Sequence, residues 1–347
     1  KLIDIGNVNW IDCGHLEGLA TAKQKLVISR HFNSFEINPV LPVITKKSTD
    51  QTKLAQEMFW YENIPNELQS LVPKVLGISD SHIAMEYYGY GNLAEKFIYY
   101  DLPHNFWAYV LDRLFKLVKL FEQQFQEHQS NYESSLEAVD FDHVYQHKTL
   151  KRIDMLKAQD VFWEQVWAHE YIEINGVSYA NIPTMMPQLL SQLQQLKQTA
   201  VMAIVHGDLC FNNILFDIQS GIIKLIDPRG KFGTNSNTIL GDSRYDVAKI
   251  RHSYCGDYDS LVERDFILER ISDNRFKFNT NKDKKDEREK LFDSLAEKYG
   301  YCGRDIRLIE GLHFLTMIPL HQESMDRQIA IWLTAIIKLN KELIEND

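Results

Sequence analysis

One stretch, residues 205–217 (VHGDLCFNNILFD), constrains the fold of this chain more than any other. It places His206, Asp208 and Asn213 on a polar loop between the apolar runs AIV and ILF, which read as two short strands. A further apolar run, IIKLI, follows the turn sequence DIQSG and ends on Asp227. We expect the runs on either side of DIQSG to pair as a β-hairpin. This pairing would bring Asp227 beside Asn213 and let the loop aim Asp208 into the same cleft.

These polar residues match what phosphoryl transfer from ATP requires. The protein must hold Mg²⁺ against the phosphates and orient a hydroxyl whose proton is accepted late. Mg²⁺ prefers hard oxygen ligands, and one carboxylate must face the incoming hydroxyl. The stretch therefore supplies one base and two metal ligands from local geometry. The competing interpretation is that Asp208, Asn213 and Asp227 are ordinary turn residues, since Asp and Asn are common in turns.

The pattern HGDLCFNNIL followed by LID closely resembles the catalytic core of the aminoglycoside phosphotransferase and choline/ethanolamine kinase superfamily. The resemblance implies an α+β fold of the bilobal protein-kinase-like type, with a small β-rich N-lobe and a larger helical C-lobe. It implies that Asp208 is the catalytic base and that Asn213 and Asp227 hold Mg²⁺. ATP is the implied phosphate donor.

The stretch GDSRYDVAKI (241–250) is similar to the family's G-D-x-x-x-D-L-A segment. The resemblance implies that Asp246 braces the catalytic loop, and we expect a similar structural part for His206, which would bond loop backbone. Arg229 and Asp242 are weaker candidates for contact with the acceptor. Arg229 could bind a substrate carboxylate, phosphate or hydroxyl, or it could instead brace Asp242 or a helix end.

Residues 31–89 read as a small mixed lobe that would clamp the nucleotide. FEINPVLPVITKKST predicts two short strands with a turn near Asn38. DQTKLAQEMFWYENIP predicts a helix that begins after the N-cap Asp50 and ends at Pro65. SHIAMEYYG predicts a strand that leads to a hinge, where backbone groups of Glu86, Tyr87 and Tyr88 would meet the adenine.

A kinase-like enzyme needs a strand Lys for the phosphates and a helix Glu that holds this Lys. Lys46 and Lys47 stand at a strand end, and Glu57 lies on the next helix. Successive strand residues point to opposite faces, so one of the two lysines faces the cleft. The spacing to Glu57 favours Lys46. No G-x-G-x-x-G loop precedes Lys46, and the words H-R-D, D-F-G and A-P-E are missing, which weighs against a protein kinase.

Residues 90–347 read as a helical lobe that holds one β-ribbon. Apolar residues at helical spacing predict helices over 105–125 and 185–200, and a helical pattern after Asp242 that continues to the C-terminus. The charged run 281–290 predicts a solvated loop and helix face.

Composition excludes several function classes. A net charge of −10 disfavours a general nucleic-acid binder, because phosphate backbones require a basic face. No apolar run approaches the length of a membrane span. The four cysteines are scattered, which favours a reducing, cytoplasmic setting without disulfides or a zinc site.

A narrower resemblance is carried by RHFNS, ITKKS, KLAQEMFWYENIP, IDPRGKFG and GDSRYDVAKIRHS. Together these segments resemble phosphotransferase domains from bacterial capsule and surface-polysaccharide loci, over residues 30–340. Residues 1–30 resemble the tail of the nucleotidyltransferase domain that precedes some of these kinases, which implies that the chain belongs to a fusion; an ordinary N-terminal strand and helix is the alternative. We therefore predict an ATP- and Mg²⁺-dependent kinase that phosphorylates an alcohol acceptor such as an amino alcohol, polyol or sugar. The alternatives are a catalytically silent scaffold module and a protein kinase.

Overall fold

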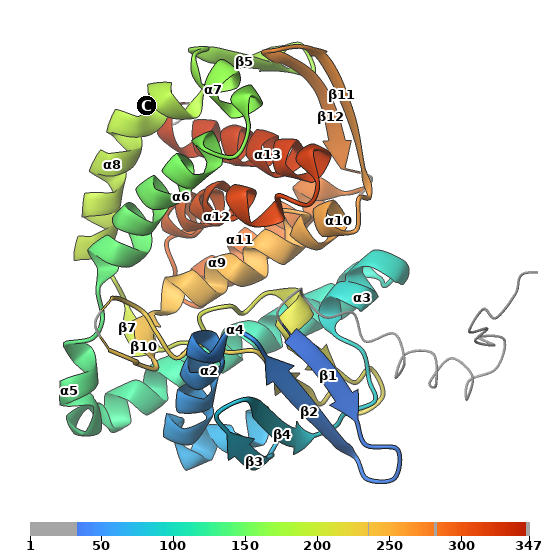
Figure 1. Cartoon of the computed structure of the whole chain (residues 1–347), viewed down its shortest axis with the longest axis vertical. Coiled ribbons are helices and arrows are strands. Elements are labelled where there is room, and N and C mark those ends of the chain that lie inside the picture. The colour runs from blue at the N-terminus through green and yellow to red at the C-terminus, as the bar shows by residue number, and fades with distance from the viewer. Residues whose placement is uncertain (1–32, 235, 281–282, 345–347) are drawn as a thin grey trace, which may run out of the picture.

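The computed structural model describes residues 33–234, 236–280 and 283–344. They form a small lobe of four strands and one long helix beside a larger, mostly helical lobe (Figure 1). The expected α+β division is confirmed. The predicted N-terminal extension, residues 1–30, lies outside the described residues.

The small lobe is an antiparallel sheet with the strand order β1-β2-β4-β3. Its strands are β1 (Asn33–Ile37), β2 (Val43–Ser48), β3 (Val75–Ser79) and β4 (His82–Glu86). The hairpin predicted around Asn38 is confirmed. The sequence reading missed β3, because this edge strand contains Gly77, is mostly exposed, and pairs with a register shift between Val75 and Gly77.

Helix α2 (Gln51–Asn63) packs against this sheet and contacts the larger lobe. It begins as predicted, with the Asp50 carboxylate accepting the Lys53 N–H at 3.1 Å, and it ends one residue before extended Ile64, which precedes Pro65. The buried Trp60 indole donates to the Val205 carbonyl at 2.7 Å. This bond joins α2 directly to the backbone that leads into the catalytic loop.

The large lobe contains the predicted helices over 105–125 and 185–200, among others. Its helices are α3 (Leu93–Tyr99), α4 (His104–Glu127), α5 (Glu133–Leu136), α6 (Lys148–Lys157), α7 (Val161–Trp167), α8 (Ile182–Gln198), α9 (Ser243–Tyr254), α10 (Tyr258–Val262), α11 (Lys285–Lys298), α12 (Gly303–Met317) and α13 (Met325–Leu343). A short π-helix, Asp142–His147, leads into α6, and 3₁₀ turns cover Asn66–Leu71, Gln129–Tyr132, Phe211–Asn213 and Ile318–His321.

Two short ribbons hold the catalytic loop. Strand β7 (Met202–Ile204) pairs with β10 (Leu240–Asp242), and β8 (Ile214–Phe216) pairs with β9 (Ile223–Leu225). The second pair is the hairpin predicted around DIQSG, and it is confirmed with Ile214 opposite Leu225.

The expectation of a single β-ribbon in the large lobe, with helix alone after Asp242, is wrong. A further sheet of order β11-β12-β5-β6 lies at the far end of the lobe (Figure 1). It consists of β5 (Tyr171–Ile174), β6 (Val177–Ala180), β11 (Phe266–Ser272) and β12 (Arg275–Thr280). Asn175 and Gly176 both adopt positive φ in the β5–β6 turn, so the Asn-Gly pair was an available hairpin signal.

One hydrophobic core runs through the described part of both lobes. Trp163, Trp332 and Tyr254 are each at most 1% exposed and belong to this core. Within the described ranges, no helix is long and apolar enough to cross a membrane.

Candidate active site

Asp246 fixes the backbone at the start of the predicted catalytic loop, residues 206–213. The fully buried carboxylate of Asp246, on α9, accepts the N–H groups of His206 at 2.6 Å and Gly207 at 2.9 Å. Gly207 adopts a φ of +77°, where a side chain is strained, and an added Cβ would lie 3.0 Å from the Arg229 Cβ. Burial raises the pKa of Asp246 to about 7, against the effect of these two N–H bonds.

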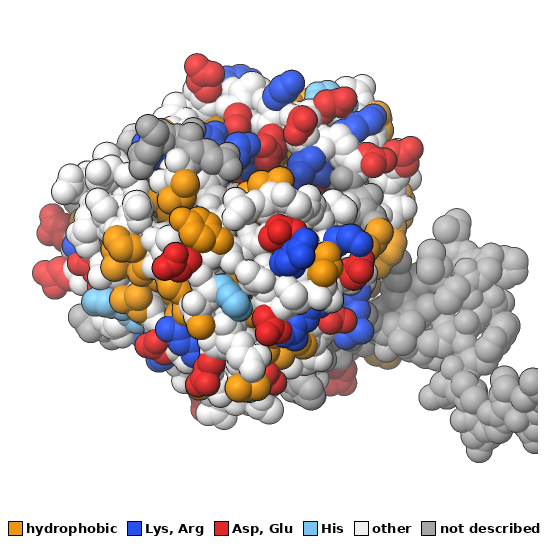
Figure 2. All heavy atoms as spheres, turned by 90° about the horizontal axis from the view of Figure 1, so that it is seen from above, with side chains coloured by type: hydrophobic (Ala, Val, Ile, Leu, Met, Phe, Trp, Pro, Cys, Tyr) orange, Lys and Arg blue, Asp and Glu red, His pale blue; other side chains and the backbone are white. Residues whose placement is uncertain are grey.

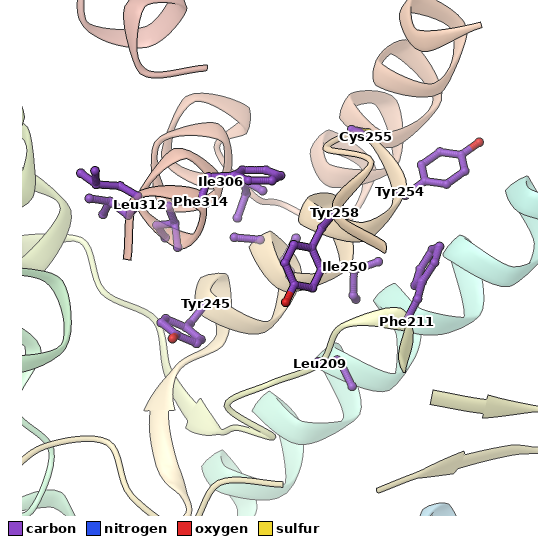
Figure 3. Packing of buried hydrophobic residues seen from close by; sticks show 14 of the residues in the cluster. Leu209, Phe211, Tyr245, Ile250, Tyr254, Cys255, Tyr258, Ile306, Leu312 and Phe314 are labelled. Carbon is purple, nitrogen blue, oxygen red and sulfur yellow. The ribbon is translucent and has the colours of Figure 1, made fainter. Parts of the chain in front are cut away.

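His206 and the apolar loop residues complete this anchoring. The His206 Nε2 lies 3.0 Å from the Ile226 carbonyl, which ties the loop to the end of β9. Burial lowers the pKa of His206 to about 4, so the ring is neutral near pH 7. Figure 3 shows Leu209 and Phe211 of the loop among the buried core residues, and the Phe211 ring stacks on Trp107 at 5.6 Å. The structural part expected of His206 stays a prediction, and the bond of its ring to backbone is consistent with it.

The two predicted metal ligands come together at the end of the β8–β9 hairpin. The Ile226 N–H donates to the Asn213 carbonyl at 3.0 Å, which places Asp227 next to Asn213. The Asn213 side-chain amide donates to the Asp208 carbonyl at 2.9 Å. Asp227 adopts a φ of +59°, a left-handed conformation that is unusual outside glycine and is found at strained functional positions.

The oxygen ligands available here suit Mg²⁺ better than a metal that is held by protein side chains alone. The Asn213 amide and the Asp227 carboxylate supply hard oxygen atoms, and the Asp227 side chain is 36% exposed. The described residues contain no group of three or more His, Cys, Asp or Glu side chains that could hold a metal. Mg²⁺ sites built on one or two protein oxygens commonly take their remaining ligands from phosphates and water.

A buried cation from the small lobe reaches this hairpin. The Lys46 Nζ lies 2.6 Å from the Glu57 Oε2 and 2.5 Å from the Asp227 Oδ1. Lys46 and Glu57 are both about 5% exposed or less, whereas Lys47 points outward and pairs with the exposed Glu36. Of the two lysines, Lys46 is thus the one that lies beside Glu57 and contacts Asp227.

The charges of this triad influence one another. Burial raises the pKa of Glu57 to about 7, although the Lys46 ammonium opposes the rise. Burial alone would lower the pKa of Lys46, but Asp227 and Glu57 outweigh it and the pKa is raised. Lys46 therefore remains an ammonium group between two carboxyl groups.

The predicted hinge segment, residues 86–88, lies at the end of β4. The Glu86 N–H donates to the Lys74 carbonyl at 3.0 Å, and the Tyr87 N–H donates to the Pro42 carbonyl at 2.8 Å. The Tyr88 hydroxyl donates to the Glu86 carboxylate at 2.9 Å. Two of the three hinge amides are thus engaged inside the small lobe, so an adenine would have to use other backbone groups of this segment.

Two cations hold the carboxylate of Asp208. The Arg229 Nη2 lies 2.8 Å from the Oδ2, and the Lys249 Nζ lies 2.9 Å from the Oδ1. Lys249 is buried, and the Asp208 carboxylate raises its pKa although burial alone would lower it. The sequence reading did not include Lys249. Its position three residues after Asp246 on one helix was an available signal, because both side chains then face the catalytic loop.

Asp242 lies in a different environment from the other candidates. It is fully buried at the start of α9, where its carboxylate accepts bonds from the Arg244 side chain and from the Tyr145 hydroxyl at 3.0 Å. It also accepts the Arg244 N–H and caps the helix. We therefore do not propose Asp242 as an acceptor ligand, and Arg229, which contacts Asp208 and not Asp242, keeps that candidacy.

No protein-family model and no curated protein sequence matches the chain. Among solved structures, the choline kinase from Cryptosporidium parvum Iowa II aligns with a TM-score of 0.54 at 12% identity, over 96% of this chain and 97% of that one. Choline kinase LicA from Streptococcus pneumoniae aligns with a TM-score of 0.50 at 13% identity, over 92% of this chain and 98% of that one. Likeness at this level of identity concerns the fold alone. The chain has the α+β, bilobal protein-kinase-like fold.

Proposed function

We propose that this chain is an ATP- and Mg²⁺-dependent kinase that phosphorylates the hydroxyl group of a small molecule. The observation that carries the proposal is the contact of Lys46 with both Glu57 and Asp227, which links the small lobe to the hairpin that also positions Asn213. Asp208 lies on the same loop, and its carboxylate is fixed by cations. The fold shared with two choline kinases agrees with this reading.

The proposed reaction is a direct transfer between two oxygen atoms. The acceptor oxygen attacks the γ-phosphorus of ATP, the bond from that phosphorus to the β–γ bridging oxygen breaks, and ADP leaves. The hydroxyl proton passes to the Asp208 carboxylate, which orients the hydroxyl beforehand. Lys46 would contact the donor phosphates. Mg²⁺, held by Asn213 and Asp227, would supply positive charge that offsets the charge of those phosphates.

Lys249 and Arg229 would act on the same carboxylate in different ways. Lys249 is buried, so its bond to Asp208 would fix the orientation of the base. The Arg229 side chain is 46% exposed and would be able to exchange its bond to Asp208 for a bond to the acceptor or to the transferred phosphoryl group.

The biological setting follows from the sequence resemblance and not from the site. We infer that the acceptor is a building block of a bacterial capsule or surface polysaccharide, and that the reaction takes place in the cytoplasm. The inferred fusion to a nucleotidyltransferase domain would place the product close to an enzyme that activates phosphorylated compounds.

An ATP-consumption screen tests the proposed activity. Purified protein would be assayed with choline, ethanolamine, glycerol, other polyols, amino acids and sugars, with and without Mg²⁺. We expect Mg²⁺-dependent ADP formation with at least one alcohol and none with Asp208→Ala, while Lys47→Met serves as a control of unchanged activity. A silent scaffold would show neither turnover nor a Mg²⁺-dependent thermal shift with nucleotide. Phosphate transfer to generic proteins alone would favour a protein kinase.

A further inference from the structure

Two basic side chains on α6, Lys148 and Arg152, lie near Tyr245 of α9. Lys148 and Arg152 are one helical turn apart, so they lie on the same face of α6. The Lys148 Nζ lies 3.1 Å from the hydroxyl of Tyr245 and 5.6 Å from its ring centre. Tyr245 precedes Asp246 on α9, the helix that also carries Lys249 (Figure 3 shows Tyr245 at the start of this helix). The α6 cations therefore adjoin the residues that hold the catalytic loop.

Lys148 and Arg152 lack acidic partners among the residues that the structure describes. The hydrogen bond of Lys148 goes to a neutral hydroxyl, and the contact of Arg152 is with a methionine sulfur at 4.0 Å. Both side chains are half-buried. Burying a cation without a paired anion is unfavourable, so such groups are normally compensated.

The other buried arginines of the large lobe follow that rule. Arg244 pairs with Asp242 and Asp305, Arg251 pairs with Glu310, and Arg288 pairs with Asp257. On the outer face of the lobe, acidic and basic side chains are interspersed (Figure 2). The whole chain is acidic, with a net charge of −10. The excess of positive charge beside Tyr245 is therefore local and does not reflect the net charge of the chain.

The cations of this region act on one another. Burial lowers the pKa of Lys148, and the positive charges of Arg229 and Lys249 lower it further. Burial also lowers the pKa of Arg152, again with a contribution from Arg229. Burial alone would raise the pKa of Tyr245, but Lys148, Lys249 and Arg229 together lower it. Lys148, Arg152, Arg229 and Lys249 thus form one positive cluster, in which Asp208 is the carboxylate that Arg229 and Lys249 share.

We propose that the acceptor alcohol carries a compact anionic group, a phosphate or a carboxylate, which Lys148 and Arg152 bind while its hydroxyl faces Asp208. The inference deepens the proposed kinase function and rests on it for the position of the reacting hydroxyl. Arg229 contacts Asp208 and interacts electrostatically with both α6 cations, so it would contact the acceptor near the site of transfer. A positively charged acceptor such as choline would be repelled by the same cluster.

Three acceptors with one carbon skeleton test the charge requirement. Glycerol, glycerate and glycerol 3-phosphate would be titrated by calorimetry into the protein saturated with Mg²⁺ and a non-hydrolysable ATP analogue, and also into the nucleotide-free protein. We expect glycerate or glycerol 3-phosphate to bind at least about tenfold more tightly than glycerol, because charge-assisted bonds are about twice as strong as neutral ones. The order of the two anions distinguishes a carboxylate site from a phosphate site. Equal or tighter binding of glycerol would overturn the proposal.

Matched variants on α6 distinguish a specific anion site from the general effect of removing one positive charge. Lys148→Met and Lys151→Met each remove one charge from the same helix, but Lys151 is exposed and makes no hydrogen bond or ion pair among the described residues. We expect Lys148→Met to weaken anion binding about tenfold, and Lys151→Met to leave it unchanged. Equal effects of the two changes would contradict the assignment. Nucleotide binding by the wild type and by each variant reports both folding and the donor site. A wild type that fails to bind nucleotide counts against the kinase function, whereas a wild type that binds nucleotide but does not prefer the anions counts against this inference alone.

Discussion

The region around Lys46, the proposed nucleotide side, and the region around Tyr245, the proposed acceptor side, differ in how their cations are balanced. On the nucleotide side, Lys46 lies within 2.6 Å of two carboxyl groups, from Glu57 and Asp227. On the acceptor side, Lys148 and Arg152 have no carboxylate partner within the described ranges. Lys46 is thus already paired with protein carboxyl groups at the proposed nucleotide site, whereas at the proposed acceptor site we propose that a bound anion supplies the balancing charge.

The largest expected effect comes from the base that stands between the two sides. Asp208→Ala should lower kcat by about 100- to 10,000-fold, the usual contribution of a general base, because the acceptor hydroxyl loses its proton acceptor. Nucleotide affinity, measured by calorimetry, should change little, since Lys46 and Asp227 remain. Near-normal turnover by this variant would refute the assigned role.

Removing Lys46, the paired cation on the proposed nucleotide side, should produce the next largest effect. Lys46→Met should weaken binding of the ATP analogue by about 10- to 100-fold, because a charge-assisted bond contributes about 1.5–3 kcal/mol. Lys47→Met, whose side chain pairs with exposed Glu36, is the matched control and should bind the analogue normally. Similar losses in both variants would show that the spacing to Glu57 does not select the phosphate lysine.

The acceptor side can be probed without removing a charge. Tyr245→Phe deletes the hydroxyl that bonds Lys148 and should raise the KM for an anionic acceptor about fivefold, as expected for loss of about 1 kcal/mol of hydrogen bonding. The KM for ATP should stay constant, because Tyr245 lies away from the Lys46 triad. An increase in the KM for ATP alone would contradict the placement of Tyr245 at the acceptor site.

Nucleotide binding at the Lys46 site should also depend on pH. Burial raises the pKa of Glu57 to about 7, so its carboxylate, which holds Lys46, forms as the pH rises from 6 to 8. Nucleotide affinity should therefore increase over this interval by about threefold, and Glu57→Gln should remove the increase. Because the folded pKa exceeds the ordinary value of 4.5, the contribution of Glu57 to stability is present in acid and lost as the pH passes 7. Chemical denaturation of wild type and Glu57→Gln at pH 5 and 8 checks this sign.

The sequence predicted the nucleotide side better than the acceptor side, for physical reasons. Asp208, Asn213 and Asp227 lie within twenty residues and are joined by one hairpin, so local spacing was enough to place them together. Lys46 and Glu57 are eleven residues apart on adjacent elements, which again leaves few arrangements.

The acceptor side depends on contacts between distant segments. Lys148 and Tyr245 are 97 residues apart in the sequence, and no local hydrophobic pattern indicates that they are in contact. The β11–β12 hairpin was missed for a related reason, since its alternating apolar residues lie between strongly helical stretches and were assigned to them. Lys249 was also missed, although its spacing from Asp246 already placed it on the face of α9 that meets the loop.

The most direct test of the central claim is a crystal structure with Mg²⁺ and a non-hydrolysable ATP analogue. We predict a metal ion at about 2.0–2.1 Å from the side-chain oxygens of Asn213 and Asp227. The Lys46 ammonium should contact the phosphates, and the terminal phosphate should face Asp208. Nucleotide bound elsewhere, or a metal that touches neither Asn213 nor Asp227, would contradict the account.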